Sequence, residues 1–188
     1  MGGHGNIALR SPAFFTAMTT AAAPLNPATL QAMADFPRRL EQFYEAIPES
    51  HKNWTPASWE GIPSETFSAL GQICHVRDIE IEGYHLRFAR TLAETHPLLA
   101  SLDGYVLERE RGYANAEAQE VLAAFRAARA RTMGILAGIP PDALERTAEF
   151  EGYGALTLRS LVHYLCSHDQ QHLAGLQWLL GKIDAARV

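Results

Sequence analysis

Apolar residues recur three or four positions apart over several long stretches of the chain, which is the spacing of a buried helix face. Four such stretches cover residues 27–47, 64–99, 115–137 and 157–181. Asn26 followed by Pro27 is typical of a helix start, and Ser64 is expected to open the second helix. No stretch alternates convincingly with the period of two that a half-buried strand shows. The pattern therefore predicts an all-α fold, a four-helix bundle.

The segments between the helices differ in length. Residues 48–63 and 138–156 are rich in proline and other turn formers, and they predict two long connections, between helices one and two and between helices three and four. A shorter link is expected between helices two and three. These lengths suggest a topology other than simple up-down-up-down. Residues 1–26 lack periodicity and are expected to form a loosely ordered leader before one domain over residues 27–188.

Two imidazoles interrupt the apolar face of the last helix. His168 and His172 are four residues apart, about 40° around the helix and roughly 6 Å along its axis, so they point the same way. Leu165 and Leu176 lie on the same face. Burial of an imidazole without a polar partner is unfavourable, and helical histidine pairs are known zinc ligands. The pair is therefore a candidate metal site that needs a third ligand.

His75, in the middle of the second predicted helix, is the candidate for that ligand. The strongest apolar stripe of this helix is rotated by roughly 100° from His75, so periodicity alone does not direct the side chain into the bundle. The other histidines of the helices and connections are expected to bond to protein groups: His51, His85, His96 and His163.

The sequences around these histidines carry a family resemblance. LGQICHVRDIE in the second helix and YLCSHDQQHLAGLQWLL in the fourth resemble, in order and separation, the DinB/YfiT-like superfamily of metal-binding four-helix bundles, over about residues 27–181. The resemblance implies a divalent ion, zinc or nickel, bound by His75, His168 and His172. It also implies a homodimer. Many members have a glutamine three residues after the last ligand, where this chain has Gly175.

Three protein ligands leave a tetrahedral ion with an open position, as in catalytic zinc sites. Such an ion lowers the pKa of a bound water and holds a thiol as thiolate. The resemblance implies a metal-dependent enzyme that transfers a low-molecular-weight thiol, such as mycothiol, bacillithiol or glutathione, to a small-molecule substrate, or a hydrolase. Glu82 is a candidate base or hydrogen-bond partner for an imidazole. Asp78 and Asp169 are expected to be solvated.

Three other interpretations stay open. Glu82-x-x-His85 and Asp169-x-x-His172 resemble the Glu-x-x-His elements of di-iron bundles, which also require inward carboxylates from the other two helices. Alternatively, a metal or polar cluster serves a non-catalytic binding or dimerisation module. In the third interpretation, the histidines bond only to protein groups and no metal binds. The number and kind of bound ions would identify a di-iron site or a chain without metal. A non-catalytic module would instead be identified by an activity that does not change when the ion is removed.

Composition and charge narrow the class of protein. The hydrophobic fraction is 47% and the charged fraction 20%, as in an ordinary globular protein. The net charge is -5, and the longest block of basic residues is Arg38–Arg39, so no nucleic-acid partner is expected. No apolar run approaches the roughly 20 residues that cross a bilayer. No secretory signal is evident either, so a cytoplasmic protein is expected, with no membrane partner and with Cys74 and Cys166 reduced.

Overall fold

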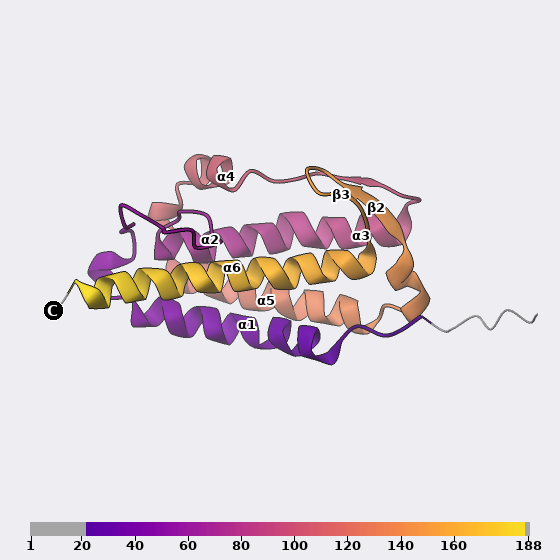
Figure 1. Ribbon diagram of the computed structural model, residues 1–188, viewed down its shortest axis with the longest axis horizontal. Helices are drawn as coiled ribbons and strands as arrows, with labels where there is room; N and C mark the ends of the chain where they lie inside the picture. Colours follow the sequence, from indigo (N-terminus) through magenta and orange to yellow (C-terminus); the bar gives the residue numbers. More distant parts are fainter. Residues whose placement is uncertain (1–21, 187–188) are drawn as a thin grey trace, which may run out of the picture.

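The computed structural model describes residues 22–186, and its main feature is four helical rods packed side by side (Figure 1). The rods are α1 (Pro27–Ala46), the continuous run of α2 (Ala69–Asp78), the π-helical η2 (Ile79–Tyr84) and α3 (His85–Ala93), then α5 (Ala118–Ala137) and α6 (Leu158–Ala185). Shorter elements lie in the connections: η1 (Glu49–His51), α4 (Gly104–Arg111), η3 (Tyr113–Asn115) and η4 (Pro141–Glu145). The predicted four-helix bundle is confirmed.

The rods do not alternate in direction. α1 packs against α5 and α6, and α2 packs against the same two helices. α1 and α6 run in one direction, whereas the α2–α3 rod and α5 run in the other (Figure 1). Each of these two pairs of neighbours is therefore parallel, and the predicted departure from up-down-up-down topology is confirmed. The short link expected between helices two and three is wrong, because residues 94–117 must run back along the bundle to start α5 at its opposite end.

Two helix boundaries differ from the prediction. The second rod begins at Ala69, where the Ser68 hydroxyl accepts a hydrogen bond from the Gly71 N–H, and not at Ser64. Residues 64–67 form a loop instead. The last helix continues through Gly181, although glycine inside an exposed helix costs about 1 kcal/mol relative to alanine. Among residues 22–186, no helix is long and apolar enough to cross a membrane.

A small sheet, which the sequence pattern did not predict, joins two connections. Its strands are β1 (Leu98–Leu99), β2 (Thr147–Phe150) and β3 (Gly154–Thr157), in the order β1-β2-β3. β1 is parallel to β2, and β2 is antiparallel to β3 with Phe150 opposite Gly154. Gly152 and Gly154 both have φ of +82°, a backbone conformation that favours glycine in the turn between β2 and β3. This hairpin turn brings Tyr153 close to α6, as described below.

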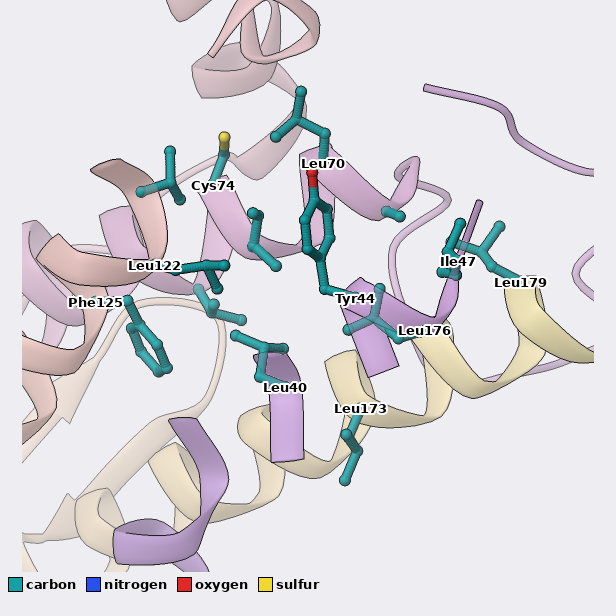
Figure 2. Packing of buried hydrophobic residues seen from close by; sticks show 14 of the residues in the cluster. Leu40, Tyr44, Ile47, Leu70, Cys74, Leu122, Phe125, Leu173, Leu176 and Leu179 are labelled. Atoms are coloured by element: carbon teal, nitrogen blue, oxygen red, sulfur yellow. The ribbon is translucent and has the colours of Figure 1, made fainter. Parts of the chain in front are cut away.

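The core consists of two apolar clusters with a polar layer between them. One cluster includes Leu40 and Tyr44 of α1 and Leu173 and Leu176 of α6 (Figure 2). The other cluster contains α6 residues only up to Leu165. The α6 residues between these two groups include the histidine pair. The middle of the bundle is therefore the place where buried polar chemistry concentrates.

The expected leader over residues 1–26 lies largely outside the described residues. Its last part, residues 22–26, contacts the bundle. Leu25 is buried, and the Arg159 guanidinium donates hydrogen bonds to the carbonyl oxygens of Ala23 and Pro24. The chain is therefore attached to α6 before α1 begins.

Candidate metal centre

Three imidazoles meet in the middle of the bundle. His168 Nε2 lies 3.2 Å from His75 Nε2 and 3.1 Å from His172 Nε2. A tetrahedral ion with zinc–nitrogen bonds of 2.0–2.1 Å would separate its ligand nitrogens by about 3.3 Å. Among residues 22–186, no other group of three or more His, Cys, Asp and Glu side chains has its ligand atoms gathered in this way. The structure thus brings together the three histidines that the resemblance implied.

The π-helical segment explains why periodicity did not place His75. A π-turn accommodates one extra residue, so positions after it are rotated by about 100° relative to those before it. His75 precedes this segment and is only 2% exposed, whereas the apolar residue Ile81, within the segment, is 40% exposed. The predicted apolar stripe therefore combined residues before η2 with residues after it as if one helical period held throughout. Once the extra residue in η2 is counted, His75 lies on the buried face of its helix.

Gln72 fixes the orientation of one imidazole. His172 Nδ1 lies 2.5 Å from the Gln72 side-chain oxygen, which can only accept, so Nδ1 carries the proton and Nε2 keeps its lone pair. The Gln72 amide nitrogen donates to Ser64 Oγ and to the Glu65 carbonyl oxygen. A Cβ added at Gly175 would lie 2.8 Å from that nitrogen, so glycine permits this close packing. The amide thereby connects α6 to the loop before α2.

Burial keeps the three imidazoles neutral. Desolvation lowers the pKa of His75 to about 4, partly opposed by Asp78. It also lowers the pKa values of His168 and His172 well below their usual range, and the neighbouring imidazoles add to the effect. Because His172 Nε2 has no proton, three nitrogens in contact cannot all be satisfied by hydrogen bonds among themselves. The converging lone pairs fit a divalent cation of the kind that prefers nitrogen ligands.

Glu65 lies over the three imidazoles from the loop before α2. Its Oε1 is 3.7 Å from His75 Nε2, and its Oε2 is 3.4 Å from His172 Nε2. Burial raises the pKa of its carboxyl group, and a hydrogen bond from its own backbone partly opposes this. The sequence pattern does not indicate Glu65 as a site residue, because it predicts that Glu65 lies in the first turn of a helix. No sequence pattern distinguishes Glu65 from other acidic residues that follow a helix N-cap.

A cavity of about 170 Å³ opens beside His75 and His168. Glu65 lines it together with residues from the helices, the small sheet and the connection after α3. These residues include Tyr84, Arg87, Phe150, Tyr153 and Tyr164. The imidazole cluster therefore borders a cavity that is smaller than the roughly 300 Å³ of typical ligand pockets, so it suits a compact molecule.

Glu82, the candidate base from the sequence, is placed elsewhere. Its carboxylate is 46% exposed and accepts hydrogen bonds of 2.6 and 2.8 Å from the Arg111 guanidinium. It borders a different cavity from the one that His75 and His168 line. The extra residue in η2 places Glu82 on the outer side of the rod, and it is Glu65 whose carboxylate lies within 4 Å of His75 and His172.

Asp78 and Asp169 are buried, so the expectation that they are solvated is wrong. Asp78 accepts a hydrogen bond of 2.7 Å from the Tyr113 hydroxyl. Asp169 accepts two from Arg129, at 2.7 and 2.8 Å, and Glu80 accepts two more from the same guanidinium. A buried carboxylate requires such partners, and the helical pattern gave no sign that Arg129 faces inward.

The di-iron arrangement is not assembled within residues 22–186. His85 Nε2 lies 3.0 Å from the Thr132 hydroxyl and 3.2 Å from the carbonyl oxygen of Ala128. Asp169 pairs with Arg129, and Glu82 lies on the outside. The other imidazoles contact hydroxyl groups, as expected: His51 with Ser50, His96 with Thr147 and His163 with Thr29.

Gly104, at the start of α4, provides a test of the histidine cluster that removes none of its nitrogens. A Cβ at this position would lie 2.5 Å from His75 Cε1 and 2.8 Å from Nδ1, so the ring must move. We expect Gly104→Ala to weaken zinc binding about 10- to 100-fold, as loss of ligand support does elsewhere. Competition with a chromogenic chelator measures the affinity. Gly134→Ala, where nothing lies within 4 Å, is the control, and equal affinities in the two variants would contradict the prediction.

The fold and the cluster define a four-helix bundle with three histidines gathered at its centre. The chain belongs to the DinB superfamily, whose family model matches residues 32–176. It is similar in structure to YfiT from Bacillus subtilis, a probable metal-dependent hydrolase with an unusual four-helix bundle topology. The TM-score is 0.73 at 19% identity, over 84% of this chain and 86% of that one, and this likeness concerns the fold. No curated protein matches the chain.

Proposed function

We propose that this protein is a divalent-metal-dependent enzyme that transfers a low-molecular-weight thiol to an electrophilic small molecule. His75, His168 and His172 would hold the ion. The observation that carries the proposal is the convergence of three neutral imidazole nitrogens beside a cavity, with a carboxylate over them. The same donors fit either zinc or nickel.

When bound, the ion would offer an open coordination position and lower the pKa of a thiol or water there. The residues of the chain supply the rest. Gln72 keeps His172 in the tautomer with a free Nε2. The Glu65 carboxylate accepts the proton of the thiol, and its raised pKa makes it a stronger base for this role. Sulfur then forms a bond to the electrophilic carbon, and the leaving group departs with its electron pair and takes up the proton from Glu65.

Hydrolysis is the second candidate function. It is favoured by the similarity to YfiT, which is described as a probable metal-dependent hydrolase. The same residues would act on water in place of the thiol, with Glu65 again the proton acceptor. A third possibility, a binding module without chemistry, predicts no turnover in either assay.

Glu65→Gln tests the role of the carboxylate. We expect the variant to keep its metal and to lose about 10²- to 10⁴-fold in kcat, the usual contribution of a general base. The assays use protein loaded with zinc or nickel. Glutathione, bacillithiol or mycothiol is paired with 1-chloro-2,4-dinitrobenzene for transfer, and p-nitrophenyl acetate without thiol reports hydrolysis.

Glu60→Gln is the matched control, because Glu60 lies in the same connection but is exposed and paired with Lys182. Its rates should equal those of the unchanged protein. Removal of the metal with a chelator should abolish activity, and added metal should restore it. Turnover that is insensitive to the chelator and to Glu65→Gln would contradict the proposal.

A further inference from the structure

Arg87 is a buried guanidinium in the wall of the cavity, and it has no carboxylate partner. It is 5% exposed, and its Nε and Nη2 donate to one acceptor, the carbonyl oxygen of Ala100, at 3.2 and 2.9 Å. Among residues 22–186 no Asp or Glu side chain forms an ion pair with it. The buried guanidinium of Arg129, in contrast, binds two carboxylates. A buried cation without a counter-charge is costly, and Arg87 keeps donors to offer to a ligand.

Aromatic rings surround this guanidinium and extend to the mouth of the cavity. Arg87 Cζ lies 5.0 Å from the ring centre of Tyr84 and 4.5 Å from that of Phe150. Phe150 stacks on Tyr153 with ring centres 4.6 Å apart, and Tyr153 meets Tyr164 edge to face at 5.2 Å. Tyr153 is 58% exposed and Tyr164 37% exposed, so both present apolar ring surface to a ligand. The β2–β3 turn and α6 thus build an aromatic entrance above a cation.

We propose that this cavity binds a small carboxylate with a flat apolar part, the carboxylate on Arg87 and the apolar part against Tyr153 and Tyr164. The proposal rests on the proposed function, since it gives the class of molecule held beside the metal. Arg87 and His168 line the same cavity. No lysine and no second arginine is among the described residues that line the cavity, so a monoanion fits better than a phosphate dianion.

A pair of probes that differ only in charge tests the proposal. Phenylacetate and phenylacetamide are titrated into metal-free and zinc-loaded protein, and binding is followed by calorimetry or by ligand-observed NMR. At pH 7.5 we expect metal-free protein to bind phenylacetate at least about tenfold more tightly than phenylacetamide, as a charge-assisted pair of hydrogen bonds provides. Arg87→Met should remove this preference. Arg90→Met, on the same helix but half-exposed and paired with Glu94, should retain it.

Two further variants keep the test decisive if Arg87→Met does not fold. Arg87→Lys keeps the charge without the planar pair of donors, so it should weaken phenylacetate binding about tenfold. Tyr153→Ala, at an exposed position, should weaken phenylacetate binding and leave that of acetate unchanged. Phenylacetate binding that requires zinc and is the same in Arg87→Lys would show that the carboxylate coordinates the ion, and would overturn the proposal. If the chain binds no zinc but binds phenylacetate in a way that depends on Arg87, the proposal of a carboxylate site stands and the proposed function fails.

Discussion

Replacing His168 by alanine is expected to abolish metal binding. The unchanged chain should carry about one zinc or nickel ion after reconstitution, because the three histidines form one site of the three-ligand type. His168 Nε2 lies within 3.2 Å of both other nitrogens, so it links His75 of α2 to His172 of α6. Two remaining imidazoles on separate helices are too few to retain the ion through gel filtration. Inductively coupled plasma mass spectrometry of the desalted protein gives the metal content.

His163→Ala is the matched control for this experiment. His163 lies on α6 as well, but it is exposed, and its Nδ1 makes a long contact of 3.5 Å with Thr29 Oγ1. This variant should keep its metal. A full equivalent of metal in His168→Ala would show that the ion binds elsewhere. If the unchanged chain binds none, the histidines are satisfied by protein groups, and His168→Ala should then cost only packing stability.

The sequence could predict part of this site. The spacing of His168 and His172 on an amphipathic helix is a local property, so periodicity placed them on one face without other information. His75 needed the family resemblance, because the π-helical segment shifts the register of its helix and leaves no mark in the pattern. Glu65 lies in an irregular loop, whose path depends on the Gln72 side chain and on contacts with α6. Such tertiary contacts give no periodic signal.

The same distinction holds for the fold. Long helices follow from the recurrence of apolar residues, and the four rods were predicted for that reason. The sheet was missed because β1 pairs with β2 across a large sequence separation, Leu98 opposite Glu149, and its strands are too short to show alternation. The long connection over residues 94–117 follows from the parallel arrangement of α3 and α5, which is a property of the assembled bundle. The aromatic wall of the cavity depends on this sheet, because Phe150 lies in β2 and Tyr153 in the turn that follows it.

The polar layer of the bundle contains an arginine that the sequence pattern does not single out. Arg129 lies in the same helix as Arg126 and Arg131, yet its side chain is only 2% exposed. Its guanidinium packs against an aromatic ring of the core, since Arg129 Cζ lies 5.4 Å from the ring centre of Phe36. Three arginines within one helix look alike to any local pattern. Arg129 differs from the other two arginines because η2 and α6 place the carboxylates of Glu80 and Asp169 beside it.

Arg129→Met is therefore expected to destabilise the bundle by about 3–5 kcal/mol, the cost of breaking a buried ion pair from one side. Glu80 and Asp169 are each 1% exposed and would be left close together without a cation. Thr132, which donates a hydrogen bond of 2.6 Å to Glu80, cannot replace two bidentate pairs. Equilibrium unfolding in urea, followed by circular dichroism, measures the free energy of unfolding.

Arg126→Met is the control for the loss of an arginine from α5. Its pair with Glu41 is exposed, so the free energy of unfolding should change by no more than about 1 kcal/mol. A further variant separates charge from packing: adding Glu80→Gln and Asp169→Asn to Arg129→Met removes the uncompensated charges and should recover part of the lost stability. If the single and triple variants are equally unstable, the cost lies in packing of the guanidinium between Phe36 and Phe125 rather than in the unpaired carboxylates. Recovery in the triple variant would instead show that Arg129 is retained as the counter-charge that lets two acids lie buried next to the histidine cluster.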